Sequence, residues 1–268
     1  MTAPAEASQP SGPGYAKHPG YRVALVPCAK RVRVAFNGAT LADSTATLLV
    51  RETGRVPVYY FPKDDLHLEH LVPSDHRTAC PFKGEAAYWT VAVGERQAEN
   101  AVWGYDSPYR EVAGLAGYRA FFWGLMDHWY EEDEEVFVHA RDPFVRVDVL
   151  DSRRRVQVRL GGEIVAESDR ARFLFETGLP TRYYLPTEDV RQDLLTPSDG
   201  VSACPYKGEA RYWSARIGES VFEDIVWSYP DPLPEVGGIK DRLCFFDERV
   251  DAVLLDGVEQ PKPRTKWS

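Results

Sequence analysis

The sequence predicts an all-β protein made of two tandem domains. Short runs rich in Val, Tyr, Phe and Trp alternate with polar residues, and turn-forming residues separate them at intervals of about ten. The chain also repeats itself at an offset of 124 positions. Apolar residues at helical spacing are scarce. We therefore expect antiparallel strands with few or no helices in each half.

The internal repeat sets the predicted domain boundaries. Residues 32–122 align with residues 156–246 without an insertion or a deletion. This period is too long for a solenoid unit and matches a common domain size, so duplication of a whole domain is the simplest explanation. We place the first domain at residues 19–142 and the second at 143–266. Residues 1–18 are rich in Pro, Ala, Ser and Gly and are predicted to form a disordered tail.

Turn chemistry locates the first hairpin of each domain. Asn37-Gly38 in "RVRVAFNGATLADS" and Gly161-Gly162 in "RVQVRLGGEIVAES" lie between two alternating runs. Both pairs tolerate positive φ, which tight hairpin turns require. Further strands are expected at "PVYYF", "AYWTVAVG", "NAVWGY" and "YRAFFW" and at their counterparts in the second domain. Residues 66–71 are expected to form a short helical turn.

Composition excludes several classes of function. The 268 residues carry a net charge of −9, which argues against a broad nucleic-acid surface, since phosphate binding depends on clustered Lys and Arg. No apolar run approaches the roughly 20 residues that span a bilayer, so no membrane partner is expected. The first residues lack a charged segment followed by an apolar one, which argues against secretion. Four widely spaced cysteines suit the reducing cytoplasm, where we expect this protein.

The most extended repeated motif surrounds a Cys-Pro dipeptide. "SDHRTACPFKGEAAYW", residues 74–89, recurs as "SDGVSACPYKGEARYW", residues 198–213. Pro and Gly shape turns, and a cysteine is often buried, so one hypothesis is a scaffold turn. A Lys three positions after the Cys could instead favour a thiolate, which predicts a thiol nucleophile, or line a ligand pocket. The candidate catalytic residues are Cys80, Lys83, Cys204 and Lys207.

Repeated aromatic residues predict a pocket in each domain. Adjacent rings such as Tyr59 and Tyr60 must point to opposite faces of a strand, so one can pack in the core while the other lines a cavity. Core packing alone is the alternative, since large rings stabilise cores through their buried area. An aromatic pocket would favour planar or cationic ligands. The predicted ligand-binding residues are Tyr60, Lys83, Trp103, Tyr105, Tyr184, Lys207, Trp227 and Tyr229.

Charged residues and histidines add two further hypotheses. Glu85 lies two positions after Lys83, so this pair could stabilise the turn or act on a polar ligand. His67, His70 and His76 are candidate metal ligands in the first domain, against the alternative of surface histidines. Their counterparts in the second domain are not histidines, so a mechanism common to both domains cannot use them. No metal and no cofactor is predicted.

Several motifs in the same order resemble one bacterial family. "YYFPKDD", "PSDHRTACPFKGEAAYW", "ENAVWGYDSP" and "AGYRAFF" recur as "YYLPTED", "PSDGVSACPYKGEARYW", "EDIVWSYPDP" and "KDRLCFF". This set resembles a tandem member of the domain of unknown function 427 family. The resemblance implies a β-tent-like fold, in which two antiparallel sheets lean together around a pocket. Zinc-stabilised ligand-binding domains and methionine sulfoxide reductases share that architecture. The sequence lacks the Cys-x-x-Cys pairs of the zinc-bearing relatives.

These observations predict the binding or conversion of a small planar or polar metabolite in an aromatic-lined pocket. One alternative is a thiol-dependent enzyme that uses Cys80 or Cys204 as its nucleophile. The other is a protein-interaction module with an exposed aromatic patch. The first domain has Phe82 where the second has Tyr206, and differences of this kind imply that the two pockets are not equivalent. No residue pattern predicts an oligomeric state.

Overall fold

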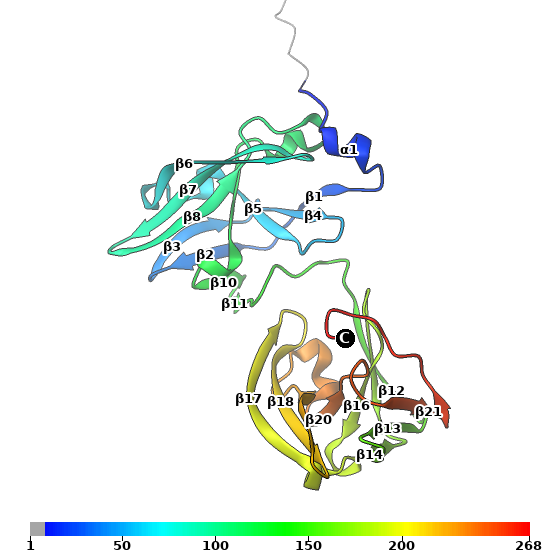
Figure 1. Ribbon diagram of the computed structural model, residues 1–268. Coiled ribbons are helices and arrows are strands. Elements are labelled where there is room, and N and C mark those ends of the chain that lie inside the picture. Colours follow the sequence, from blue (N-terminus) through cyan, green and yellow to red (C-terminus); the bar gives the residue numbers. More distant parts are fainter. Residues whose placement is uncertain (1–8) are drawn as a thin grey trace, which may run out of the picture. The chain divides into compact units, whose positions relative to one another are not determined.

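The computed structural model describes residues 9–268, which form two compact units that divide between Asp142 and Pro143 (Figure 1). Each unit contains two antiparallel sheets, and the helices are short. This confirms the predicted all-β fold in two tandem halves. Within the described residues, no helix is long and apolar enough to cross a membrane.

Unit 1 combines a seven-stranded sheet with a four-stranded sheet. Their strand orders are β1-β4-β5-β9-β8-β7-β6 and β11-β10-β2-β3. The strands are β1 (Val23–Pro27), β2 (Val32–Phe36), β3 (Ala39–Ser44), β4 (Leu48–Glu52), β5 (Val58–Pro62), β6 (Leu71–Cys80), β7 (Gly84–Val93), β8 (Arg96–Gly104), β9 (Tyr118–Phe121), β10 (His128–Glu131) and β11 (Glu134–Glu135). The helices are α1 (Pro13–Lys17) and four 3-10 turns, Lys63–Asp65, Leu68–His70, Arg110–Leu115 and Trp123–Leu125.

Unit 2 repeats this pattern. Its sheets have the orders β12-β15-β16-β20-β19-β18-β17 and β14-β13-β21-β22. The strands are β12 (Val147–Asp151), β13 (Val156–Leu160), β14 (Glu163–Ser168), β15 (Arg172–Glu176), β16 (Arg182–Pro186), β17 (Leu195–Cys204), β18 (Gly208–Ile217), β19 (Ser220–Ser228), β20 (Arg242–Phe245), β21 (Ala252–Leu255) and β22 (Val258–Glu259). Its 3-10 turns are Thr187–Asp189, Gln192–Leu194 and Pro234–Ile239. Strands β6, β7 and β8 correspond to β17, β18 and β19 at the offset of the sequence repeat.

Local sequence explains the first hairpin of each unit. Asn37 and Gly38 adopt φ values of 49° and 76° between β2 and β3, and Gly161 and Gly162 adopt 59° and 83° between β13 and β14. Two consecutive positive φ values match the twist of a two-residue hairpin, as the Asn-Gly and Gly-Gly pairs predict. The expected helical turn near residue 68 is also present, as a 3-10 helix at Leu68–His70.

The cores follow from the alternation of side chains along the strands. In unit 1, Phe36 of the four-stranded sheet and Phe61 and Phe121 of the seven-stranded sheet belong to one buried cluster between the sheets. Tyr60 belongs to a second cluster with Leu115, on the other face of the larger sheet. Neighbouring residues of a strand point to opposite faces, so Tyr59 and Tyr60 separate as expected.

Part of the expected N-terminal tail is ordered against unit 1. Residues 1–8 of this predicted tail lie outside the described residues. Residues 13–17 form α1, and the Gly14 amide donates a hydrogen bond to the Pro81 carbonyl (2.9 Å). Tyr15 packs edge-on against Phe82, with ring centroids 5.2 Å apart. The composition of the tail indicated disorder, but backbone hydrogen bonds from this segment and the Tyr15 ring place it against the Cys-Pro turn.

Candidate functional site

The Cys-Pro motif forms the hairpin turn between β6 and β7. Gly84 closes the turn at a φ of 113°, and a Cβ atom there would lie 3.2 Å from the Ser107 carbonyl oxygen. The Lys83 carbonyl accepts a hydrogen bond from the Tyr109 amide (3.1 Å). Gly208 repeats this geometry in unit 2, with a φ of 101°. The positive φ and the nearby carbonyl oxygen disfavour any residue with a side chain at Gly84 and at Gly208.

A buried ion pair lies next to this turn. The Lys83 ammonium donates a hydrogen bond to Glu52 Oε1, and the two side chains are each 10% exposed. The Tyr21 hydroxyl donates to Glu52 Oε2 at 2.9 Å, and burial together with the Glu52 carboxylate raises the Tyr21 pKa. Lys83 therefore pairs with Glu52 of β4, whereas Glu85, its expected neighbour, is exposed. Two charges removed from water need such pairing and hydrogen bonding.

A cavity of about 490 Å³ opens beside this ion pair in unit 1. Its volume lies in the range of small-molecule sites. Cys80 and Lys83 line its polar side together with Tyr21, Glu52 and Arg55. Its aromatic lining consists of Tyr59, Phe82, Trp103, Phe121, Phe122, Trp123 and Trp129.

The aromatic wall is held by ring packing and by hydrogen bonds from its polar ring atoms. The Trp103 and Phe122 ring centroids are 4.5 Å apart. Trp123 stacks on Trp129 at 4.2 Å with an interplanar angle of 4°. The Trp103 indole N–H donates to the Tyr60 hydroxyl (2.9 Å), which fixes the orientation of the indole. These contacts fix the positions of the rings, and a fixed wall lowers the entropic cost of binding.

The structure brings together some of the predicted unit 1 residues and separates others. Cys80, Lys83 and Trp103 line the cavity. Tyr60 and Tyr105 are buried and lie outside its lining, and burial raises the pKa of both phenols. Tyr60 acts on the cavity only through its hydrogen bond to the indole. Of the adjacent rings Tyr59 and Tyr60, it is therefore Tyr59 that lines the cavity, not Tyr60 as predicted.

Sequence reasoning missed the residues that differ between the two units. Trp123 and Trp129 line the cavity, but the repeat aligns them with Asp247 and Val253. The prediction used aromatic residues that recur in both repeats, and these two tryptophans do not recur. A tryptophan that is present in only one repeat is the sequence signal that could have identified them. Glu52 does recur in both repeats, but its partner lies 31 positions away.

In unit 2 the corresponding region carries a charged side chain beside the indole. Lys207 pairs with Glu176, and the Trp227 indole N–H donates to the Tyr184 hydroxyl (3.1 Å), as in unit 1. Arg182 replaces a valine, and its guanidinium lies 5.5 Å from the Trp227 ring centroid. The charged side chain covers the indole face that its unit 1 counterpart turns to the cavity. The predicted residues Tyr184, Lys207, Trp227 and Tyr229 are all buried.

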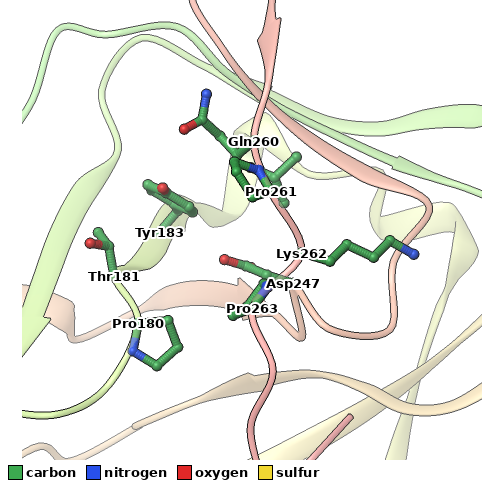
Figure 2. A pocket seen from close by; sticks show the side chains of 9 residues that line it. Pro180, Thr181, Tyr183, Asp247, Gln260, Pro261, Lys262 and Pro263 are labelled. Atoms are coloured by element: carbon green, nitrogen blue, oxygen red, sulfur yellow. The ribbon is translucent and has the colours of Figure 1, made fainter.

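A smaller hollow of about 200 Å³ remains in unit 2 (Figure 2). Thr181, Tyr183 and Asp247 line it together with residues 260–263 of the C-terminal segment. None of the residues predicted to bind a ligand in the second domain lines this hollow. Asp247 was not among the predicted site residues, and burial raises the pKa of its carboxyl to about 7.

The three candidate metal ligands do not converge. The His67 and His70 rings are 6.5 Å apart, and His67 Nδ1 lies 3.2 Å from Glu69. The His76 ring packs edge-on against Tyr88 with centroids 4.5 Å apart. In residues 9–268, no three His, Cys, Asp or Glu side chains are grouped so as to hold a metal ion.

All four cysteines are free thiols with different surroundings. Cys80 and Cys204 are half-buried at the two Cys-Pro turns. The ammonium expected to favour a Cys80 thiolate is engaged by Glu52, and this ion pair offsets its charge. Cys244 is fully buried in the unit 2 core, and burial raises its pKa well above the usual value. The nucleophile hypothesis stays a prediction.

The arrangement defines a class of protein: tandem β-domains with the same sheet order in each unit and an aromatic-lined cavity in unit 1. The sequence model of the domain of unknown function DUF427 matches residues 24–132 and again residues 148–256. The chain therefore belongs to the DUF427 family, with two copies of the domain. No curated protein matches the chain.

Proposed function

We propose that unit 1 binds a small planar metabolite that carries an anionic group. The cavity beside the Lys83–Glu52 pair carries this proposal, because its volume suits a small ligand and its lining joins aromatic rings to a polar end. Aromatic walls favour planar ligands through stacking and buried area. Unit 2 would serve as a second copy without this site, since Arg182 covers the equivalent indole.

The charges at the polar end support the choice of an anion. Lys83 and Arg55 contribute two positive charges to the lining, and Glu52 contributes one negative charge. Glu52 is already occupied by Lys83 and by the Tyr21 hydroxyl. A carboxylate ligand would find the guanidinium at the rim, whereas a cation would compete with Lys83 for the same carboxylate.

A pair of probes with the same ring system tests this function. 2-Naphthoate carries a carboxylate and 2-naphthylmethylammonium carries a cation on an equal planar body. In two-dimensional NMR of the full chain, 2-naphthoate is expected to shift the indole N–H signals of Trp103, Trp123 and Trp129. The Trp227 signal is expected to stay in place. Calorimetric titration should give a weaker affinity for the ammonium probe.

Matched substitutions locate the site. Trp103→Leu is expected to weaken 2-naphthoate binding about tenfold, the effect of losing about 1.4 kcal/mol of contact. Trp103→Phe retains a ring and should lose less. Trp227→Leu, the same change in unit 2, should leave the affinity unchanged. Binding that responds equally to both Leu variants, or the absence of any indole shift in unit 1 with either probe, would refute the proposal.

A further inference from the structure

Unit 2 contains three buried charged side chains at positions where unit 1 is uncharged. Each lies at or next to the hollow of about 200 Å³, and each is under a tenth exposed. A buried charge costs free energy unless it is paired, so such a set points to a role that its apolar counterparts lack. The charged residues are Arg182, Asp247 and Glu248, and their unit 1 counterparts are Val58, Trp123 and Gly124.

Two of these charges satisfy each other. Arg182 Nη1 and Nη2 donate to the two carboxylate oxygens of Glu248, at 2.8 and 2.6 Å. Thr265 in the C-terminal segment donates a further hydrogen bond to Glu248 Oε1 (2.7 Å). This two-point geometry is the strong form of a guanidinium–carboxylate pair. Arg182 and Glu248 together contribute no net charge, so Asp247 and Lys262 are the charged side chains that remain in the lining of the hollow.

Asp247 is the third group, and it has no such partner. Its side chain is 8% exposed and lines the hollow, yet it accepts no hydrogen bond from any other side chain of residues 9–268. The groups around it are the paired Arg182 and Glu248, the Tyr183 phenol, the Cys244 thiol and Lys262. Figure 2 shows the Lys262 side chain leading away from the Asp247 carboxyl. The Asp247 carboxyl therefore has no side-chain hydrogen-bond partner in the wall of the hollow, although its own backbone amide and the Arg182 charge stabilise its ionised form.

We propose that the unit 2 hollow binds a small organic cation, an alkylammonium of a few heavy atoms, with the Asp247 carboxylate as its counter-ion. A cation compensates the buried carboxylate, whereas an anion would add a second negative charge. The Tyr183 ring offers a further surface for the positive charge. The volume of about 200 Å³ suits a ligand of this size.

This site is independent of the proposed unit 1 site in residues and in ligand charge. Its lining consists only of unit 2 residues, and none of the unit 1 aromatic wall contributes. Binding at the hollow couples to the protonation of Asp247, because only the ionised carboxylate pairs with an ammonium ion. The carboxyl has a pKa of about 7, so the ionised fraction rises about tenfold between pH 6 and pH 8.

The test uses ethanolamine, with ethylene glycol and acetate as neutral and anionic probes of similar size. In the full chain, the carboxyl carbon signal of Asp247 is followed by NMR during a pH titration. Ethanolamine is expected to lower the Asp247 pKa and to bind about tenfold more tightly at pH 8 than at pH 6. The other two probes should leave the titration unchanged. An affinity that is the same at both pH values would overturn the proposal.

Substitutions separate the site from its alternatives. Asp247→Asn should weaken ethanolamine binding at least tenfold at pH 8, with the circular dichroism spectrum retained. Trp103→Leu should not change it, so failure of the unit 1 site and failure of this site are distinguishable. Lys262→Met should leave the Asp247 pKa unchanged, because the Lys262 ammonium is not among the groups that shift it. A rise in the Asp247 pKa in Lys262→Met would identify Lys262 as the counter-ion and would also overturn the proposal.

Discussion

Replacing Asp247 with asparagine tests the electrostatics of unit 2 through its stability. The change keeps the shape of the side chain and removes its titration. Burial raises the Asp247 pKa from 3.8 to about 7, so the folded chain keeps this proton over a pH range in which the unfolded chain has lost it. The stability contributed by the group is fully present below the unfolded pKa and is lost as the pH rises through about 7. The wild-type chain therefore loses stability across this window, and Asp247→Asn does not.

The size of the effect follows from the shift. A difference of about 3 pKa units at about 1.4 kcal/mol per unit corresponds to about 4 kcal/mol in total. Part of this loss falls below pH 5, where the unfolded chain already ionises. Between pH 5 and pH 8 the remaining change is about 3 kcal/mol. Relative to wild type, Asp247→Asn should thus gain about 3 kcal/mol between these two pH values.

Urea denaturation at the two pH values measures this difference. The indole N–H signals of Trp213 and Trp227 report the unfolding of unit 2 separately from unit 1, and the linear dependence on urea gives the free energy. Asp231→Asn is the matched control, because that side chain is 99% exposed in the same unit. A gap between Asp247→Asn and wild type that stays constant from pH 5 to pH 8 would refute the reasoning.

Three further predictions concern the repeated turn and the thiols. Lys83→Met leaves Glu52 buried without its cation and should cost about 3 kcal/mol or more in urea denaturation; a cost below about 1 kcal/mol would contradict the buried pair. Gly84→Ala should lower stability by about 1 to 3 kcal/mol, because of its φ of 113° and a carbonyl oxygen 3.2 Å from the new Cβ. Gly54→Ala, at a φ of 71° with open space, should cost less, and an equal cost would contradict the contact argument. In native alkylation followed by mass spectrometry, Cys244 should react slowest of the four thiols, because it is buried and its pKa is raised.

The candidate site was predictable only in part. The turn that carries Lys83 could be predicted from the sequence, whereas the carboxylate that pairs with Lys83 could not. The Cys-Pro turn is encoded within a few residues, so its repetition marks it in the sequence. Glu52 reaches Lys83 from β4, and that contact depends on the order of strands in the larger sheet. The adjacent carboxylate Glu85 was the nearer choice along the chain but points to solvent. Residues close together in the sequence therefore predicted the turn correctly but gave the wrong carboxylate, Glu85 in place of Glu52, as the partner of Lys83.

The sequence by itself determined the strands, the hairpins and the duplication. Alternation at Val32, Val34 and Phe36 and the Asn37-Gly38 turn are local features, whose preferred backbone geometry does not depend on distant residues. Only the tertiary structure decided how the cavities of the two copies differ. The Arg182 guanidinium and the Glu248 carboxylate are 66 positions apart, and in unit 2 this paired guanidinium lies over the Trp227 ring, where unit 1 has Val58. Such a pair forms because the folded sheet removes both groups from water at one place, a condition that no short stretch of sequence specifies.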